Sequence, residues 1–534
     1  MPPPPSTSTA LSRRHLLQAS AAWLLAGCQG DPAPQLRWVG PSPERGHLLR
    51  EPAQRQRLIS QARQQTPRRS TVLVAGGGVA GLSCARALHS SGVDVALLEL
   101  EDEAGGNARG HQLQGLPCPL GAHYLPVPDG PHGEPVRQLL AELGIARLEL
   151  GRWRYDERHL CHSPQERVFH QGQWFEGLLP PPDGPAAQQQ RTRFEAALQR
   201  VRGIGFAMPT HALPWRAEHA ALDAQTFAHW LDQQGLTDPL LRWYLDYVCL
   251  DDYGAPAHTV SAWAGLQYFA SRHGGATHSE HEAVLTWPEG NAYLTRRMAQ
   301  GLSEQLHTAR VVLAAEATRH GVTLLAYNTH TQSTEHWQGQ ALVLATPLFI
   351  SERLLLNPPD ALRSAAQQQQ RAPWLVANLL LDGPLLERVG APPAWDNVLA
   401  HHSALGYVNA QHQRLTPEPL RGAQLITAYQ ALSPARRPWL LQSAPHEALA
   451  QVLEPLLTVH PDLREQLRAA HLTRWGHAMS IPTPGLRSHP ALTALQQAHG
   501  RLHFAHADLS SYSVFEEAQA QGLRAARQVR MGLG

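Results

Sequence analysis

A glycine-rich segment near the front of the chain constrains the fold more than any other feature. The segment TVLVAGGGVAGLSCARAL, residues 71–88, begins with a short apolar run and continues in a helical pattern. Gly76, Gly78 and Gly81 stand between the two with the spacing G-x-G-x-x-G. In a strand–turn–helix unit such glycines permit a tight turn, close approach of a pyrophosphate, and close packing of the helix on the strand. The segment therefore predicts a nucleotide-binding α/β domain.

The residues that follow complete a dinucleotide site. VDVALLELE, residues 93–101, indicates a second buried strand after a helix stop at Gly92. Glu99 ends this strand about 20 residues after the glycines, where a carboxylate can accept hydrogen bonds from ribose hydroxyls. A carboxylate at that position disfavours a ribose 2′-phosphate, so NADP is the least favoured occupant. The N-terminus of the first helix provides N–H groups for the phosphates.

A second glycine pair follows the second strand. EDEAGGNARG, residues 101–110, places Gly105 and Gly106 before Asn107 and Arg109. Here the chain resembles the flavin-containing amine oxidase superfamily, which includes protoporphyrinogen oxidases and phytoene desaturases and has an arginine directly after this pair. Asn107 occupies that position here. The resemblance implies that Arg109 assists at the pyrophosphate in its place; a simple glycine-rich turn is the other interpretation.

The far end of the chain resembles the closing motif of the same superfamily. RLHFAHADLSSYSVFEEAQAQGLRAARQV, residues 501–529, indicates a strand, a polar loop and a helix. The resemblance implies that Asp508 reaches the ribityl chain of a flavin, and that the helix start, with Glu517 and Ala518, faces the pyrimidine end of the ring. Helix N–H groups there would stabilise negative charge on a reduced flavin. A domain that binds only NAD has no use for this motif, so the predicted cofactor is FAD.

The resemblance touches both ends and the middle of the chain and implies an α/β fold. A Rossmann-like FAD-binding domain is expected to be interleaved with an α+β substrate domain. In chain order the predicted parts are 1–28 export signal, 29–70 tether in part packed on the body, 71–130 FAD-binding, 131–275 helical substrate part, 276–349 FAD-binding, 350–490 substrate part, and 491–534 FAD-binding.

The N-terminal sequence indicates an export signal. SRRHLLQASAAWLLAGC, residues 12–28, places Arg13 and Arg14 before an uncharged run that ends at Cys28. The run is too short to span a bilayer as a mature helix. It resembles a twin-arginine signal fused to a lipobox. That resemblance implies export of the folded protein to the periplasm or another extracytoplasmic compartment, with lipidated Cys28 attached to a membrane surface.

Composition excludes several chemistries. The chain contains no lysine, so it can form no lysine Schiff base and has no lysine base. Its formal net charge is +1 and it has no basic block interleaved with aromatic residues, so nucleic acid is not an expected partner. None of its five cysteines stands in a CxxC or a Cys/His cluster with zinc spacing, so no metal is expected.

Candidate catalytic residues fall on two segments that resemble the flavin surroundings of the superfamily. CPLGAHYLPVP, residues 118–128, resembles the strand beside the flavin and contains His123 and Tyr124. RWGHAMSIPTPG, residues 474–485, resembles a pocket wall and contains Trp475 and His477. A histidine near its ordinary pKa can accept a proton. The alternative interpretation is a structural role for each residue, as a hydrogen-bonded histidine or a core aromatic.

Two further observations bear on the substrate. Many amine oxidases flank the amine with two aromatic side chains, and an ungapped comparison places Ala478 and Val514 at those positions, with Trp475 and Tyr512 nearby. The matched positions argue against an ordinary amine oxidase, although a shifted pair is an open alternative. Residues 244–272 are dense in Tyr and Trp and contain Asp251 and Asp252, which either meet a cationic substrate or fill capping and turn roles.

Together these features predict an exported FAD-dependent oxidoreductase that dehydrogenates a C–N or C–C bond of a small organic substrate. Hydride would pass to the flavin, and the electrons then to oxygen, a quinone or another carrier. The alternatives are a redox-neutral flavoprotein such as an isomerase, and a lipoprotein binding subunit with structural FAD. Aromatic walls with acids at the mouth of the cavity over the flavin would favour a cation, and a long apolar tunnel would favour a lipid-like polyene.

Overall fold

The structure is a computed structural model that describes residues 34–128, 130–271, 283–413 and 422–533. Residues from Leu36 onward form one compact unit, to which the following description applies. The predicted export signal and lipidation residue, Cys28, lie outside the described residues. Within the described ranges, no helix is both long enough and apolar enough to cross a bilayer.

A five-stranded parallel sheet carries the glycine motif. Its order is β13-β4-β3-β17-β23, and every neighbouring pair is parallel. All residues of the two strands nearest the motif, β3 and β4, are buried, as expected for parallel strands covered on both faces. The strand bounds are β3 Val72–Ala75, β4 Val95–Leu98, β13 Leu306–His307, β17 Ala341–Leu344 and β23 Leu502–Phe504. The sheet therefore joins the front, middle and end of the chain.

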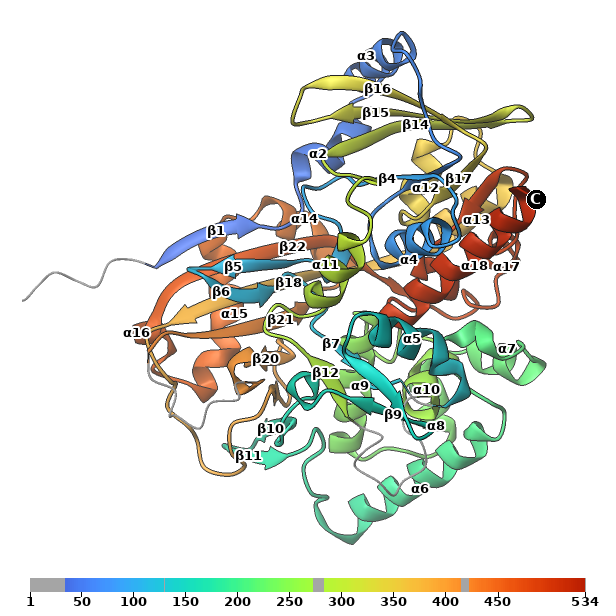
Figure 1. The fold of residues 1–534 in the computed structure, drawn as a ribbon. Helices are drawn as coiled ribbons and strands as arrows, with labels where there is room; N and C mark the ends of the chain where they lie inside the picture. The colour runs from blue at the N-terminus through green and yellow to red at the C-terminus, as the bar shows by residue number, and fades with distance from the viewer. Residues whose placement is uncertain (1–33, 129, 272–282, 414–421, 534) are drawn as a thin grey trace, which may run out of the picture. The chain divides into compact units, whose positions relative to one another are not determined.

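Two helices from opposite ends of the chain lie together against this sheet (Figure 1). They are α4 (Val79–His89), which follows the glycine turn, and α18 (Phe515–Leu533), which ends the described chain. Gly522 allows their close approach, because a Cβ there would lie 2.2 Å from the carbonyl oxygen of Ala80. The C-terminal motif is in this way packed directly on the N-terminal one.

A mixed eight-stranded sheet forms the second layer. Its order is β1-β22-β18-β21-β20-β19-β10-β11. Side chains of β18 alternate between its faces with the period of two typical of strands: Trp374 and Val376 pack toward a helical cluster, and Leu375 and Ala377 toward α15. The bounds are β1 Gln35–Val39, β10 Glu166–His170, β11 Gln173–Glu176, β18 Gln370–Leu381, β19 Asp396–Leu399, β20 Gly406–Val408, β21 Gln424–Ala431, β22 Leu467–Ile481 and α15 Pro445–Val459.

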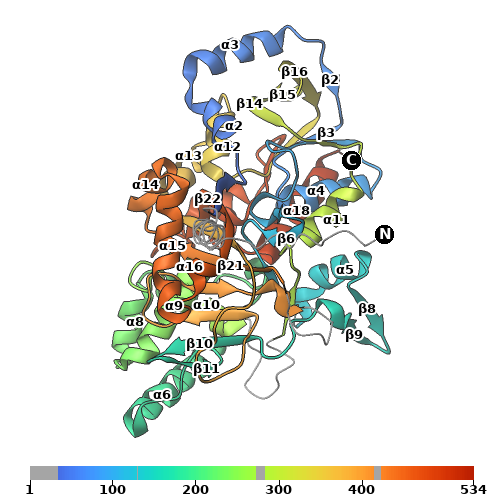
Figure 2. The same ribbon diagram turned by 90° about the vertical axis from the view of Figure 1, so that its left-hand side faces the viewer.

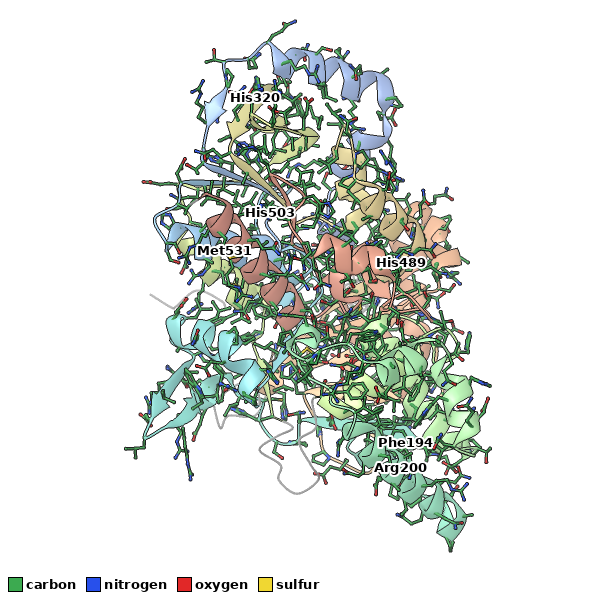
Figure 3. The ribbon with its side chains drawn as sticks, turned by 90° about the vertical axis from the view of Figure 1, so that its right-hand side faces the viewer. Phe194, Arg200, His320, His489, His503 and Met531 are labelled. Carbon is green, nitrogen blue, oxygen red and sulfur yellow. The ribbon has the colours of Figure 1, made fainter. Side chains whose placement is uncertain are left out.

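The helical cluster covers the face of this sheet that carries Trp374. Its members are α6 Gly184–Arg202, α7 Ala217–Asp223, α8 Phe227–Gln233, α9 Pro239–Tyr253 and α10 Ala262–Ser271. Helix α6 is amphipathic: Phe194 is buried and meets Phe269 edge-on, whereas Arg200 is exposed (Figure 3). Helix α9 begins at the Asp238 cap, which accepts from the Leu241 N–H at 2.8 Å, and ends at left-handed Gly254.

Residues 34–70, which include most of the predicted tether, fold onto the body. The segment contains β1, α2 (Pro43–His47), the short helix η1 (Leu48–Arg50), α3 (Pro52–Arg63) and β2 (Arg68–Arg69). Helix α3 buries Leu58, Ile59 and Ala62 against the sheet β14-β15-β16-β2 (Figures 1 and 2). The bounds of that sheet's longer strands are β14 Arg310–Thr318, β15 Gly321–Asn328 and β16 Ser333–Gly339.

The remaining elements connect these layers. They are β5 Gly110–Leu113, β6 Leu116–Pro119, β7 Tyr124–Pro126, α5 Glu134–Glu142, β8 Ala146–Glu149, β9 Arg152–Tyr155, β12 Val284–Thr286, α11 Ala292–Gln300, α12 Leu348–Leu354, α13 Asp360–Gln368, α14 Arg437–Gln442, α16 Leu463–Gln466 and α17 Pro490–Leu495. Four cysteines are described, and all are free thiols: Cys84, Cys118 and Cys249 are buried and Cys161 is partly buried.

Candidate active site

A cavity of about 570 Å³ runs between the parallel sheet and the mixed sheet. At one end it is lined by the glycine turn after β3 and the acidic end of β4, which together are called the dinucleotide end below. At the other end it is lined by aromatic residues of β18, β21 and β22 and by the last turn of α9, which are called the aromatic end. The volume lies within the usual range for sites that bury an organic ligand.

The glycine turn at the dinucleotide end requires glycine at Gly76 and Gly81. Gly76 has a φ of +104°, in the left-handed region. A Cβ on Gly81 would lie 1.8 Å from the carbonyl oxygen of Gly76. Gly76 and Gly78 line the cavity, whereas Gly81 packs helix α4 against the turn. Gly76 and Gly81 thus fill the turn and packing roles that the spacing predicts, whereas the approach of a pyrophosphate to Gly78 stays a prediction.

The second glycine pair is joined to the first turn. The Gly105 N–H donates to the carbonyl oxygen of Gly77 at 2.7 Å, and a Cβ on Gly106 would lie 3.2 Å from the Cα of Gly78. Gly105 and Gly106 both line the cavity. The backbone of the two loops therefore forms one continuous surface at this end.

Glu99 is buried and braces the glycine turn while it lines the cavity. Its Oε2 accepts from the Gly77 N–H at 2.6 Å, and its Oε1 accepts from the Glu101 N–H at 2.9 Å. Burial raises the pKa of Glu99, and the two backbone N–H groups oppose that rise. Each carboxylate oxygen keeps a second lone pair, so the predicted bond to a ribose hydroxyl is compatible with this geometry.

Asn107 and Arg109 line the cavity next to these loops. Asn107 donates from Nδ2 to the carbonyl oxygen of Ala478 at 2.7 Å, which ties the dinucleotide end to the opposite wall. Arg109 Nη1 lies 3.6 Å from Glu101 Oε2, and its guanidinium lies 5.9 Å from the centre of the Trp475 ring. The predicted role of Arg109 at a pyrophosphate stays a prediction.

Asp508 lies behind the cavity wall and has no exposed surface. Its carboxylate accepts from Arg371 through both oxygens, with Nη1 at 2.7 Å from Oδ1, and from the Leu348 N–H at 2.9 Å. Burial alone would raise the pKa of Asp508, but the charges of Arg371 and His506 hold it well below its usual range. Arg371 and His506, which contact this carboxylate, line the cavity, whereas Asp508 itself does not, and its predicted contact with a ribityl chain stays a prediction.

The start of helix α18 faces the cavity as predicted. Val514, Phe515 and Ala518 line it. Glu517 is fully buried and turned away from the cavity, where it accepts from the Thr210 N–H. Burial raises the pKa of Glu517. Ala518 thus lies where the sequence places it, whereas the Glu517 side chain anchors the helix from behind.

All four predicted catalytic residues line the cavity. The His123 ring stacks on Tyr429 with a centroid distance of 4.3 Å and lies 5.1 Å from the Tyr124 ring. Burial lowers the pKa of His123 to about 4, so its imidazole is neutral at pH 7. A pKa that low makes His123 a weak base at neutral pH. Its stacking on Tyr429 is a structural role that does not depend on proton transfer.

Trp475 and His477 lie on the wall formed by β22. The Trp475 indole Nε1 donates to the carbonyl oxygen of Leu120 at 2.6 Å, which holds the β22 wall against the loop before His123. The His477 ring lies 4.8 Å from the Phe349 ring. Burial and then the charges of neighbouring arginines, Arg437 first, lower the pKa of His477 to about 4. The His477 ring is therefore uncharged at neutral pH.

Two aromatic residues of this wall were not predicted. Trp374 of β18 lies opposite Trp475 of β22, and Tyr429 of β21 lies opposite Val376 of β18, so all four side chains share one face of the sheet. Trp374 and Tyr429 line the cavity. Residues 370–381 and 424–431 are mostly apolar, and an apolar run of this kind does not say which face of a strand meets a ligand.

The two positions that match the amine-flanking aromatic residues of amine oxidases lie on the cavity wall. Ala478 and Val514 line the cavity, and neither is aromatic. Tyr512 is fully buried behind the wall, so it does not replace an aromatic residue at Val514. Trp475 does line the cavity, and with Trp374 and Tyr429 it forms the aromatic surface.

Asp251 and Asp252 line the aromatic end and belong to the last turn of α9. Gly254 presses this turn against β18, because a Cβ there would lie 2.7 Å from the Trp374 indole nitrogen. Asp252 is 4% exposed, and its Oδ2 accepts from the Tyr512 hydroxyl at 2.6 Å. The two acids lie at a helix end rather than before the start of α10, so they do not cap that helix.

More carboxyl groups lie near these two acids. Burial raises the pKa of Asp396 well above its usual range, and the charges of Asp251 and Glu166 add to the rise. Glu166 and Asp396 are paired residues of the parallel strands β10 and β19. A raised pKa favours the uncharged form of Asp396, so the negative potential that would attract a cationic ligand rests on Asp251 and Asp252, which line the cavity.

The residues of the cavity fit an FAD. At the dinucleotide end, the backbone of Gly76, Gly78 and Gly106 would meet a pyrophosphate that side chains would exclude, and Glu99 would meet a ribose. Arg371 and the start of α18 would meet the flavin half. When bound, FAD supplies hydride-acceptor chemistry, and the protein supplies orientation and exclusion of water.

Comparisons with known proteins agree with this fit. The profile of the family "Flavin containing amine oxidoreductase" matches residues 79–530. Human amine oxidase [flavin-containing] B is 25% identical over 294 residues, which are 54% of this chain and 52% of that protein. The Oncorhynchus mykiss amine oxidase [flavin-containing] gives the same identity and coverage. The chain thus spans about half the length of the curated relatives it matches.

Solved structures share the fold at low identity. Putrescine oxidase bound to putrescine superposes with a TM-score of 0.65 at 17% identity, over 87% of this chain and 100% of that one. Cyclohexylamine oxidase from Brevibacterium oxydans gives a TM-score of 0.63 at 17% identity, over 87% and 99%. A fatty acid isomerase from P. acnes gives 0.58 at 15% identity, over 85% and 97%. These matches confirm the predicted fold class and the predicted cofactor, FAD.

Proposed function

The chain belongs to the flavin-containing amine oxidoreductase family, and on that premise we propose that it dehydrogenates the C–N bond of a cationic organic amine with FAD as oxidant. The observation that carries the proposal is the composition of the aromatic end. Asp251 and Asp252 line the same cavity as Trp374, Tyr429 and Trp475. Aromatic faces attract ammonium groups, and nearby carboxylates strengthen that attraction.

The residues of the aromatic end would hold and orient the amine. The rings of Trp374 and Tyr429 would bind the alkyl or aryl part of the substrate and exclude water from the carbon that loses hydride. The carboxylates of Asp251 and Asp252 would bind the ammonium form of the substrate, whose nitrogen would release one proton to water before the adjacent carbon loses hydride, so that the product is a protonated imine. The low pKa of His123 keeps its ring neutral, so it adds no repulsion to a cation. The electrons would then leave to oxygen, a quinone or another carrier.

A redox-neutral isomerisation of a C=C bond is the second candidate. Apolar side chains also line the cavity, among them Val376, Met479 and Val514. The fold likeness to a fatty acid isomerase supports the same candidate. A long unsaturated acid would bury more apolar surface, but its carboxylate would be repelled by Asp251 and Asp252.

Anaerobic mixing of the FAD-loaded protein with single compounds tests the proposal. The panel consists of benzylamine, putrescine, spermidine, linoleic acid and NADH, and the flavin colour is followed over time. We expect at least one amine to bleach the flavin faster than NADH does. Turnover of linoleic acid without net bleaching would favour the isomerase, and fast reduction by NADH alone would contradict an organic donor.

A charge variant sharpens this test. Asp251→Asn removes one negative charge from the aromatic end, so the apparent affinity for the amine should fall about tenfold. The FAD content should stay unchanged, because Asp251 is far from the glycine loops in the chain and lines the other end of the cavity. Asp360→Asn is the matched control, since the Asp360 side chain is 97% exposed. Equal amine affinity in both variants would show that the charge of Asp251 does not contribute to amine binding, which contradicts this part of the proposal.

Export and lipid attachment belong to the same proposal and rest on the sequence of residues 12–28 alone. Replacing Arg13 and Arg14 with Lys should keep the protein in the cytoplasm, because the twin-arginine route requires that pair. Cys28→Ser should abolish labelling by a radioactive fatty acid while leaving FAD bound. Release of the wild-type protein from membranes by salt alone would argue against a lipid anchor.

A further inference from the structure

A segment that precedes the family match forms part of the cavity wall. Residues 41–49, called the strap below, run through α2 into η1. The strap residues that line the cavity are Pro41, Arg45, Gly46 and Leu49. They share that cavity with Gly76, Gly78 and Glu99, whereas the family profile begins only at residue 79. The strap therefore contributes to the same cavity as the glycine motif.

Arg45 fastens the strap to the loop that follows β4. Its Nη2 donates to Asp102 Oδ1 at 2.8 Å, and its Nη1 donates to the carbonyl oxygen of Leu100 at 3.3 Å. Nη1 also lies 3.8 Å from Glu101 Oε2, and the Ser42 N–H donates to Glu101 Oε1 at 3.0 Å. These partners come directly after Glu99, the predicted ribose ligand. The strap is thus attached at the dinucleotide end rather than at the aromatic end.

The strap has a second attachment on its other side. Leu48 is buried in a cluster with Leu58 and Val311. Arg55, just after the strap, donates from Nε to the carbonyl oxygen of Leu313 at 2.9 Å. Helix α2 has only five residues, too few to be stable by itself, so its conformation depends on these contacts. The strap is consequently held in place by its contacts with neighbouring segments rather than by its own helical hydrogen bonds.

We propose that the strap is a component of the FAD site: it covers the dinucleotide end, and cofactor exchange requires it to open. Arg45 acts as a positioning residue that keeps the strap closed. Arg45 also balances the charges of Glu101 and Asp102, which would otherwise repel an anionic pyrophosphate nearby. This inference concerns the cofactor alone and holds whatever the substrate is.

The first test measures FAD binding to the full-length apoprotein through the fluorescence of FAD. Arg45→Ala removes two hydrogen bonds made by a charged group, so we expect the dissociation constant to rise about tenfold and FAD release to accelerate. Arg57→Ala is the control, because Arg57 is exposed on α3 and does not line the cavity. The same dissociation constant in Arg45→Ala and the wild type would overturn the role of Arg45.

The second test uses the unmodified protein and needs no variant to fold. Trypsin cleaves after arginine, so bound FAD should slow cleavage at Arg45–Gly46 several-fold when fragments are followed by mass spectrometry. Cleavage after Arg319, which is exposed on the turn between β14 and β15, provides the reference rate. If FAD leaves the ratio of the two rates unchanged, the strap does not close over the cofactor and the proposal is wrong.

Discussion

The dinucleotide end and the aromatic end of the cavity are built in different ways. At the dinucleotide end the backbone forms the surface, and glycines are required because a Cβ on Gly81 would overlap the Gly76 carbonyl oxygen. At the aromatic end, side chains from β18, β21 and α9 form the surface. A site made of backbone leaves a fixed spacing in the sequence, whereas a site made of side chains depends on which strands and helices meet. Arg371 of β18 pairs with Asp508, which follows β23 of the parallel sheet, so a change at Arg371 affects the contact between the two sheets.

The largest expected effect follows from Arg371→Met. The variant leaves the fully buried carboxylate of Asp508 without its cationic partner, which should lower the free energy of unfolding by about 3–5 kcal/mol. Urea unfolding of the apoprotein measures this loss. Arg363→Met is the control, because Arg363 and Asp360 form an exposed pair whose loss should change stability by less than about 1 kcal/mol.

The Arg371 effect should also depend on pH. The folded-state pKa of Asp508 is depressed, so its ion pair stabilises the protein above the unfolded pKa and loses that effect as pH falls toward the folded value. The wild type and Arg371→Met should therefore become more similar in stability below about pH 4. A difference that grows on acidification would show that Asp508 is not the partner that matters.

The second effect is on the dinucleotide end. Gly81→Ala places a methyl group against the Gly76 carbonyl oxygen, which should destabilise the turn by about 2–3 kcal/mol and weaken FAD binding about 100-fold. The bound FAD per protein after gel filtration measures the change. Gly383→Ala is the control, since a Cβ there meets its nearest atom at 3.8 Å. Full FAD content in Gly81→Ala would contradict the claim that steric overlap requires glycine at position 81.

The third effect is confined to the aromatic end. Trp374→Leu removes an aromatic face from the cavity, so the rate at which an amine reduces the flavin should fall about tenfold while FAD affinity is unchanged. Stopped-flow absorbance measures the reduction rate. Trp439→Leu serves as the control, because Trp439 is half-buried on α14 and does not line the cavity. If Trp374→Leu loses FAD and Trp439→Leu does not, Trp374 also supports the cofactor, which contradicts the separation of the two ends.

The smallest expected effect is a loss of stability on acidification. Burial lowers the folded-state pKa of His123 from 6.5 to about 4, so neutral His123 stabilises the fold above pH 6.5, and that contribution falls between pH 6.5 and 4. His123→Phe should make the stability less dependent on pH in that window, because the variant has no imidazole to titrate there. His320→Phe, at an exposed turn residue (Figure 3), should leave the slope unchanged. Equal slopes in both variants would contradict the lowered pKa.

The fold and the dinucleotide end could be predicted because they leave local patterns. The spacing of Gly76, Gly78 and Gly81 with Glu99 at a strand end indicates a nucleotide turn wherever it occurs. The C-terminal motif placed the start of α18 at the cavity, and Val514 and Ala518 do line it. Local sequence was sufficient in these cases because each element supplies its own surface.

The remaining features depend on contacts between distant residues. Asp508 is paired with Arg371, 137 residues away, so no local pattern shows that its carboxylate is already engaged. Trp374 faces the cavity because of the register of β18 on β22, which shifts at a bulge between Ala372 and Trp374. The strap is rich in residues typical of linkers, and only its contacts with Leu100, Glu101 and Asp102 give it a place in the site.

The most direct test of the central claim is a crystal structure of the FAD-loaded protein with a bound amine. The account predicts the pyrophosphate beside Gly76 and Gly106, the flavin ring beside Trp475, and the amine between Trp374 and Asp251. An FAD bound elsewhere, or an amine bound outside the aromatic end, would contradict it.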